Sequence, residues 1–340
     1  MKIYSLAFFC LFQFSFVCQE ALKVTTSSPI TESLQKLDIN RPGAMNIVFK
    51  STDGGQTWQD ISEGLPEAGQ EEDGIYRDVF FADERGLFLS AGDWIYHNKP
   101  NSKAPFWSKE ISLDEHRSIA PAGKTGIFAY NYNEGQFVRS INGTSVWTSA
   151  YTNLQAKEVR TVFETAGGTV FVGTNNGILK STNGGKSWKP VHGGGWVMKF
   201  VESNGVLMAT SAKGIIRSTD DGENWELVIS EGGVGIAIEN VKGGFAAITF
   251  NTVSETRRVR TSYDGGKSWN PIDAGLPPSL SIASIVQVDE YLFCGHPTGI
   301  FRSSDKGKTW KLLLPSIENK VFNLRVSGNV IYAIPRAGGC

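Results

Sequence analysis

Three arginines stand at the start of similar apolar segments in the first half of the chain. They are Arg77, Arg117 and Arg160, and each is followed two residues later by Val or Ile. A guanidinium group binds a carboxylate through parallel N–H donors, so three arginines along one arc could hold an anionic ligand. The alternative is that each arginine pairs with a nearby acid, such as Glu115 or Glu158.

Acidic residues gather in two long polar stretches, and a pair of carboxylates is what glycoside hydrolysis requires. Ser62–Tyr76 contains Glu67, Glu71, Glu72 and Asp73, and Asn251–Arg258 contains Glu255, Arg257 and Arg258. Loops on a rigid scaffold often carry specificity, but acidic loops of this kind are also often only solvated. The sequence leaves both interpretations open, and we assign no catalytic residue.

Other kinds of chemistry are disfavoured by residue type and spacing. The histidines, at positions 97, 116, 192 and 296, lack metal-ligand spacing, so we expect no metal site and no cofactor. Gly193-Gly194-Gly195 is not followed by the lysine of a phosphate-binding loop. A net charge of −1 gives no electrostatic basis for binding nucleic acid or an anionic membrane surface.

A repeated eight-residue turn must position these residues. It runs from Ser to Trp, with Asp or Asn in third place, in five clear copies: Asp53 to Trp58, Asn183 to Trp188, Asp220 to Trp225, Asp264 to Trp269 and Asp305 to Trp310. Two weaker copies end at Trp147, with Asn142 in third place, and at Trp107, with Ser102 in place of the acid. Asp or Asn can accept backbone N–H groups of the turn, Gly supplies positive φ, and Trp packs its ring on the hairpin.

The spacing of the repeats predicts the fold. The seven tryptophans are 49, 40, 41, 37, 44 and 41 residues apart. Strand-like segments at a period of about forty residues are typical of a propeller. We therefore predict an all-β, seven-bladed β-propeller with four-stranded antiparallel blades. The hairpin of Asn46–Ser51 and Thr57–Ile61 lacks two strands, which Val321–Val326 and Val330–Ile334 would supply, closing the ring without free edges.

The octets resemble the Asp-box, or BNR, repeat of sialidases, xyloglucan-active glycosidases, sortilin-type receptor domains and photosystem II assembly factors. The resemblance covers about residues 45 to 335. It implies that each Asp-box lies between the third and fourth strands of a blade, away from the functional face, and is structural. By the same analogy, the functional face consists of the loops that enter each first strand and those that join second to third strands.

The resemblance makes Arg77, Arg117 and Arg160 candidate ligand-binding residues, because sialidases clamp their substrate's carboxylate with three arginines. The likeness to sialidases stops there: their Arg-Ile-Pro motif is absent, they have six blades, and no Tyr/Glu nucleophile pair or Asp acid is identified. We favour a non-catalytic propeller that binds a protein or glycan ligand through its loop face. A sialidase-like or related glycoside hydrolase is the alternative, and an assembly factor similar to the photosystem II propellers is a weaker third.

The start of the chain indicates export. In residues 1–18, Lys2 precedes an apolar run, Ile3–Val17, that is too short to span a bilayer, as in a secretory signal peptide. Residues 19–44 are polar and aperiodic, which predicts a linker before a propeller domain at 45–340. We expect a monomer that is secreted, periplasmic or at the cell surface, without a transmembrane segment. Lipid anchoring at Cys18 is a disfavoured alternative.

Two cysteines remain in the predicted propeller domain, Cys294 and Cys340. Export would permit a disulfide between them. Cys294 lies in an apolar run, where a buried free thiol fits equally well.

Overall fold

The computed structural model describes residues 46–66, 80–92, 94–112, 117–140, 146–151, 153–156 and 158–337. The chain divides into two compact units, Met1–Asn40 and Arg41–Cys340, and every described residue belongs to the second. The predicted signal peptide, the predicted linker and Cys340 lie outside the described residues.

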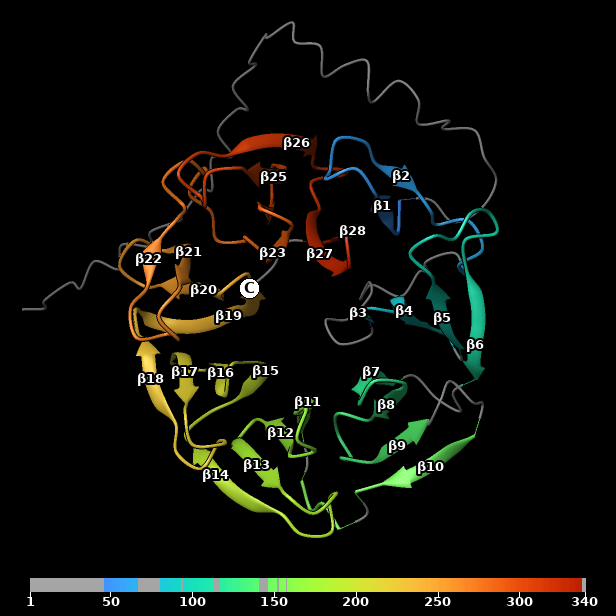
Figure 1. The fold of residues 1–340 in the computed structure, drawn as a ribbon, viewed down its shortest axis with the longest axis vertical. Helices are drawn as coiled ribbons and strands as arrows, with labels where there is room; N and C mark the ends of the chain where they lie inside the picture. Colours follow the sequence, from blue (N-terminus) through green and yellow to red (C-terminus); the bar gives the residue numbers. More distant parts are fainter. Residues whose placement is uncertain are drawn as a thin grey trace, which may run out of the picture. The chain divides into compact units, whose positions relative to one another are not determined.

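The described residues form seven four-stranded antiparallel sheets, arranged as the blades of a propeller (Figure 1). Six blades consist of four consecutive strands each. These strands are β3 (Phe80–Asp83), β4 (Gly86–Ala91), β5 (Trp94–Asn98) and β6 (Ser108–Ser112); β7 (Ser118–Ala122), β8 (Gly126–Tyr130), β9 (Phe137–Ser140) and β10 (Trp147–Ala150); β11 (Val159–Glu164), β12 (Val170–Thr174), β13 (Gly177–Ser181) and β14 (Lys189–Gly193); β15 (Val197–Ser203), β16 (Val206–Ser211), β17 (Gly214–Ser218) and β18 (Glu226–Ile229); β19 (Gly232–Val241), β20 (Gly244–Asn251), β21 (Thr256–Ser262) and β22 (Asn270–Pro271); β23 (Ser284–Val288), β24 (Tyr291–His296), β25 (Gly299–Ser303) and β26 (Lys311–Pro315).

The seventh blade joins the two ends of the described chain, as predicted. Its strand order is β2-β1-β28-β27, with β1 (Phe49–Ser51), β2 (Gln59–Asp60), β27 (Val321–Ser327) and β28 (Val330–Arg336). β1 pairs antiparallel with β28, and Phe49 stands opposite Ala333. The C-terminal strands therefore pair with the N-terminal hairpin and close the ring.

The second strands of the blades are more deeply buried than the fourth strands. Every residue of β12 is buried, whereas all four residues of β10 are half-buried or exposed. The second strands are enclosed because apolar residues of adjacent blades pack between the sheets. Phe171 of β12, for example, lies in one core cluster with Phe200 and Leu207 of the next blade. The hydrophobic core is thus divided into layers between neighbouring blades.

The Asp264 turn shows how the repeated hairpin closes. Asp264 Oδ1 accepts hydrogen bonds from Ser262 Oγ (2.8 Å) and from the backbone N–H groups of Lys267 and Ser268 (both 3.0 Å). Ser262 Oγ in turn accepts from the N–H of Gly266 (2.9 Å), whose φ of 80° lies in the left-handed region. The same serine-to-acid and turn N–H bonds recur at Asp53, Asn183, Asp220 and Asp305.

Six of the tryptophans that follow these turns donate their indole N–H groups, in one of two ways, whereas Trp188 Nε1 is buried without a hydrogen-bond partner among the described residues. The first way is a bond to a glycine carbonyl of the same turn, at 3.1 to 3.2 Å, made by Trp58, Trp225 and Trp269. The second is a bond to a backbone carbonyl of the preceding blade, at 2.5 to 2.9 Å, made by Trp107, Trp147 and Trp310. Tryptophans of the second kind tie their blade to its neighbour. Asn142 lies outside the described residues.

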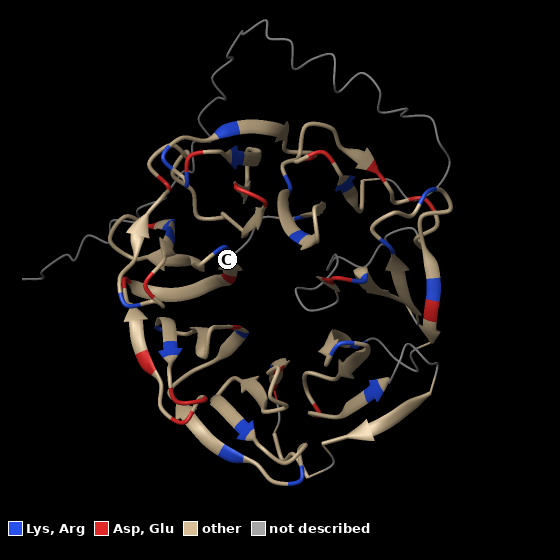
Figure 2. Cartoon of the chain, in the orientation of Figure 1, with Lys and Arg blue, Asp and Glu red and all other residues tan. Residues whose placement is uncertain are grey.

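A basic residue directly before the Asp-box serine donates a hydrogen bond to a backbone carbonyl of the next blade. We call this hydrogen bond the inter-blade latch. In each case the donor is on a third strand, where Figure 2 shows basic residues on several blades, and the acceptor is the carbonyl of the fourth Asp-box residue. The latches are Lys180 Nζ to Asp221 (2.5 Å), Arg217 Nε to Gly265 (2.7 Å) and Arg302 Nη1 to Gly54 (2.9 Å).

Candidate functional site

The predicted arginine arc is only partly within the described residues. Arg77 lies outside them, as do Glu115 and the acids at positions 67, 71, 72 and 73. Arg117 is half-buried directly before β7, and Arg160 is half-buried near the start of β11. The two arginines therefore enter the first strands of consecutive blades. Their role in ligand binding stays a prediction.

The second candidate loop, Asn251–Arg258, is held by contacts within the protein. Arg257 is buried and its Nη1 donates to the Ile282 carbonyl at 2.9 Å. Arg258 makes a two-point ion pair with Asp273, with Nε 2.6 Å from one carboxylate oxygen and Nη2 3.2 Å from the other. Both arginines are thus engaged in fixing this loop, and we do not place a ligand on them.

Arg160 stands at the centre of a polar and aromatic group, which we call the rim cluster: Tyr132, Arg160, Asn175 and Trp196. The Arg160 guanidinium carbon lies 5.6 Å from the centre of the Tyr132 ring and 5.7 Å from that of Trp196. Its Nε donates to Asn175 Oδ1, and the Asn175 side-chain amide donates to the Tyr132 hydroxyl at 2.9 Å. Rings within about 6 Å attract a cation through their faces.

Three blades contribute to the rim cluster. Tyr132 follows β8, Arg160 belongs to β11 and Asn175 follows β12, while Trp196 directly precedes β15. These positions are entries to first strands and connections from second to third strands, so they share one face of the ring. Because propeller loops on one face converge from neighbouring blades, residues far apart in the sequence meet here.

The contacts of Arg160 bear on the two interpretations of its role, both of which stay predictions. Within the described part of the chain, Arg160 makes no ion pair with Glu158, and its Nε donates to Asn175 Oδ1 instead. Among the described residues, the guanidinium thus has a neutral amide partner and no carboxylate partner. An anion could therefore bind at the rim cluster without displacing a carboxylate.

Tyr132 and Trp196 were not identified from the sequence as site residues. Nine tryptophans are present, and seven of them belong to Asp-box copies. The remaining two, Trp94 and Trp196, lie at the start of a third strand and directly before a first strand. A tryptophan outside the Asp-box copies was therefore the sequence feature that could have pointed to a site on the loop face.

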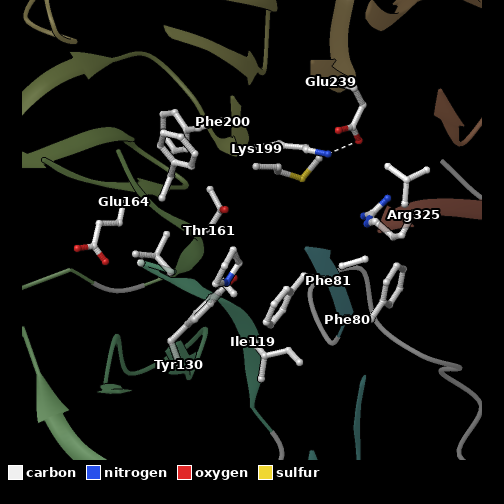
Figure 3. A pocket seen from close by; sticks show the side chains of 18 of the residues that line it. Phe80, Phe81, Ile119, Tyr130, Thr161, Glu164, Lys199, Phe200, Glu239 and Arg325 are labelled. Atoms are coloured by element: carbon white, nitrogen blue, oxygen red, sulfur yellow. Dashed lines mark hydrogen bonds and ion pairs between the residues drawn. The ribbon is translucent and has the colours of Figure 1, made fainter. Parts of the chain in front are cut away.

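A cavity of about 410 Å³ lies in the channel of the ring, next to the rim cluster. The first strands of all seven blades contribute to its wall, which includes Tyr130 and Thr161 (Figure 3). Thr161 follows Arg160 directly in the chain, and Tyr130 and Met198 contact Arg160. Tyr130 connects the two regions, because its hydroxyl donates to the Arg160 carbonyl at 3.3 Å.

The carboxylates that line this cavity are already in contact with basic groups. Glu239 pairs with Lys199 across the channel wall (Figure 3). Glu164 points away from the middle of the cavity and lies 3.4 Å from Arg139 Nη2 (Figure 3). Hydrolysis of a glycoside needs one carboxyl group to act as an acid and a second as a base or nucleophile. Two separate ion pairs do not supply that arrangement.

The hairpin of β1 and β2 carries the family signature. The BNR/Asp-box repeat family matches residues 49–60, which comprise both strands and the Asp53 turn. The same turn geometry recurs in blades around the seven-bladed ring.

The described residues thus form a seven-bladed propeller, and its β1–β2 hairpin matches the BNR/Asp-box repeat.

Solved structures of other propellers resemble this propeller in fold. A GH74 xyloglucanase from Xanthomonas campestris is 16% identical, with a TM-score of 0.59, over 79% of this chain and 51% of that one. YCF48 bound to D1 peptide is 13% identical, with a TM-score of 0.50, over 76% and 93%. An extracellular domain of a hybrid two-component system from B. thetaiotaomicron is 13% identical, with a TM-score of 0.54, over 74% and 35%.

At these identities the likeness shows the fold alone. This propeller spans about half the length of the GH74 structures that it matches, 43% of one and 51% of another. No curated protein matches its sequence significantly.

The Asp-box carboxylates of this propeller are saturated with turn hydrogen bonds. Bonds from the Thr309 hydroxyl and N–H, and from Ser303, lower the pKa of Asp305 to about 2. Bonds from Ser268 and Ser262 likewise hold the pKa of Asp264 below its usual range. These acids are ionised at neutral pH and committed to the turn. The hydrogen-bonding capacity of these two acids is thus used within their own turns, and the structural role of the Asp-box residues stays a prediction.

Several further features of the propeller bear on its chemistry. Among the described residues there is no group of three His, Cys, Asp or Glu side chains that could hold a metal ion. In the same residues, no helix has the length and apolar character to cross a bilayer. Cys294 is a fully buried free thiol in β24, and burial raises its pKa. A thiol in this state is unreactive toward solvent oxidants.

Proposed function

We propose that this protein is an exported, non-catalytic propeller that binds a protein or glycan ligand through its loop face. Arg77, Arg117 and Arg160 would contact carboxylates of the ligand along one arc. The observation that carries the proposal is the rim cluster, in which Arg160 lies between two aromatic rings without a carboxylate partner among the described residues.

The composition of the rim cluster suits recognition of an acidic ligand. Tyr132 is 38% exposed, so one ring of the cluster is accessible to a bound molecule. Aromatic faces stack on sugar rings or on apolar side chains, and the guanidinium supplies a directional contact to a carboxylate. Asn175 and the rings hold the guanidinium in one orientation, which reduces the entropy lost on binding.

The comparisons support a binding role for a fold of this kind. One similar propeller was solved with a bound peptide, and another is a xyloglucanase, which acts on a polysaccharide. A third is an extracellular domain, which is compatible with the export indicated by residues 1–18. None of these similarities identifies a ligand for this protein. We therefore propose the class of ligand from the chemistry of the rim cluster.

Hydrolysis of a glycoside is the alternative, and the channel cavity does not favour it. An enzyme of that type needs two carboxyl groups about 5 to 10 Å apart at the substrate. In the cavity, Glu239 and Glu164 each contact a basic side chain from a different part of the ring. Turnover of a panel of chromogenic glycosides by the wild-type protein would overturn the non-catalytic assignment.

The test replaces Arg77, Arg117 and Arg160 together with Gln. We expect the triple variant to keep the wild-type melting temperature, because Arg117 and Arg160 are only half-buried and guanidinium groups in such positions contribute little to stability. It should lose binding to sialylated glycans or Asp/Glu-rich peptides, whichever of these two the wild type binds on a glycan array and a peptide array. A matched control replaces three exposed lysines, Lys186, Lys267 and Lys311, with Gln and should bind as the wild type does.

Two results would contradict the proposal. One is a wild-type protein that binds neither kind of acidic ligand. The other is a triple variant that melts at lower temperature while binding is retained, which would show that the arginines are structural partners of neighbouring acids.

A further inference from the structure

The channel cavity contains a second arginine whose charge the site proposed above does not use. Arg325 belongs to β27 of the closing blade, and its side chain points toward the middle of the cavity (Figure 3). Its guanidinium carbon lies 4.9 Å from the centre of the Phe80 ring, and Nη1 donates to the Leu324 carbonyl at 2.8 Å. The Arg336 guanidinium lies 6.0 Å from the same ring.

The other charged groups on the cavity wall cancel in pairs. Lys199 is paired with Glu239, and Glu164 is paired with Arg139 outside the cavity lining. Among the described residues, Arg325 makes no ion pair with a carboxylate. Counted over the described lining residues and their ion-pair partners, the cavity wall therefore carries one surplus positive charge, in a channel where the surrounding protein weakens screening by water.

The rest of the wall is largely apolar. It includes Phe81, Ile119, Met198, Phe200 and Val286, which come from four different blades. A volume of about 410 Å³ lies within the range of small-molecule sites, which are mainly apolar with a few polar groups that fix orientation. A ligand that matches this wall has an apolar body and a single negative charge.

We propose that the channel cavity binds a small organic monocarboxylate with an aromatic or branched aliphatic body. The carboxylate contacts the Arg325 guanidinium, which Phe80 holds in place by stacking, and the body packs against Phe81, Met198 and Phe200. This site is separate from the rim cluster, and it does not depend on the arginine arc or on a macromolecular ligand.

The first experiment compares three probes of equal size on the full chain by isothermal titration calorimetry. The probes are 3-phenylpropionate, the neutral 3-phenylpropan-1-ol and the cationic 3-phenylpropylamine. We expect 3-phenylpropionate to bind, the alcohol to bind at least about tenfold more weakly, and the amine not to bind, because a charge-assisted bond to Arg325 is lost in both. Equal binding of acid and alcohol, or no binding of the acid, would overturn the proposal.

Two variants locate the binding on these residues. Arg325→Gln removes the charge, and Ala82→Phe keeps the charge but fills part of the cavity from β3. Each should weaken 3-phenylpropionate binding by about tenfold or more, whereas Lys311→Gln, which removes a charge from an exposed outer strand, should not change it. Circular dichroism identifies a variant that has not folded, and the second variant then serves alone. Unchanged affinity in a folded Arg325→Gln or Ala82→Phe protein would refute the assignment.

Discussion

The Asp-box turns and the rim cluster satisfy their polar groups in opposite ways. The hydrogen bonds to Asp264 come from residues no more than four positions away in the chain. The side-chain partners of Arg160 are 15 and 38 positions away, at Asn175 and Met198. A turn closed by its own residues can be repeated in blade after blade, whereas the rim cluster requires a different residue from each of three blades. The bonds of the repeated hairpins are thus local, whereas those of the rim cluster join different blades, and we propose that ligand specificity resides in these loops.

The largest expected effect tests whether local bonds are enough to hold a blade. Deleting residues 321–340 removes β27 and β28 but leaves the Asp53 turn between β1 and β2 intact. We expect the truncated protein to unfold or aggregate, because β1 loses its partner β28 and exposes an unpaired edge. Thermal melting and size-exclusion chromatography measure the effect. A truncated protein with the wild-type melting temperature would show that the ring does not depend on this closure.

A smaller effect is expected when a single tryptophan is replaced on either the Asp-box face or the loop face of the ring. Trp269→Ala removes an Asp-box ring that packs against a core cluster between blades, and we expect a loss of about 3 kcal/mol in the free energy of unfolding. Trp196→Ala removes a ring of the rim cluster, so we expect less than about 1 kcal/mol. The same variant should weaken binding of the acidic ligand by about tenfold, since interface tryptophans are often energetic anchors. Chemical denaturation gives the free energy of unfolding of each variant, and ligand titration gives its affinity. A larger loss of stability in Trp196→Ala, or a larger loss of affinity in Trp269→Ala, would contradict the separate roles of the two faces.

The smallest effect concerns the response of the Asp-box turns to acid. The folded pKa of Asp305 is about 2, and that of Asp264 is also lowered, whereas an Asp in an unfolded chain titrates near about 3.9. The unfolded chain therefore takes up protons first, so the stability from these groups is present above about pH 4 and is lost as the pH falls toward 2. The melting temperature of the wild type should decrease across this interval.

A variant with Asn at both positions, Asp264→Asn with Asp305→Asn, should show a smaller decrease. Asn183 shows that the amide fits the turn, because its Oδ1 accepts the Ser187 N–H at 3.0 Å. The melting temperature as a function of pH provides the measurement for both proteins. Identical acid dependence would mean that other carboxylates control the acid transition.

The sequence predicted the fold well because the Asp-box signal is local. The Ser, Asp and Gly of a turn bond within one octet and the Trp ends it at a fixed position, so their spacing predicted seven blades and the closing pair of strands. The ends of strands were less accurate: Thr57–Ile61 was expected, but β2 comprises only Gln59–Asp60. Side-chain acceptors replace ladder bonds there, since Ser62 Oγ accepts the N–H of Val48 at 3.1 Å.

The rim cluster could be predicted only in part. Arg160 was expected at the entry to a first strand, where the structure places it, and its ligand-binding role stays a prediction. Tyr132, Asn175 and Trp196 stand at no fixed spacing from one another in the sequence. Their meeting depends on how three blades are set around the ring, which no single octet encodes.

The inter-blade latch makes the blade of β15 to β18 resemble a building block with one acceptor edge and one donor edge. The blade of β15 to β18 accepts a bond from Lys180 at one edge, through Asp221, and donates one to Gly265 at the other, through Arg217. Inserting a duplicate of such a blade would preserve every junction, because the new unit brings its own donor and its own acceptor. A gene for this fold can therefore lengthen or shorten by whole blades, and the number of units is limited only by whether the last donor can still meet the first acceptor. In this chain that final junction is Arg302 with Gly54, between residues 248 positions apart.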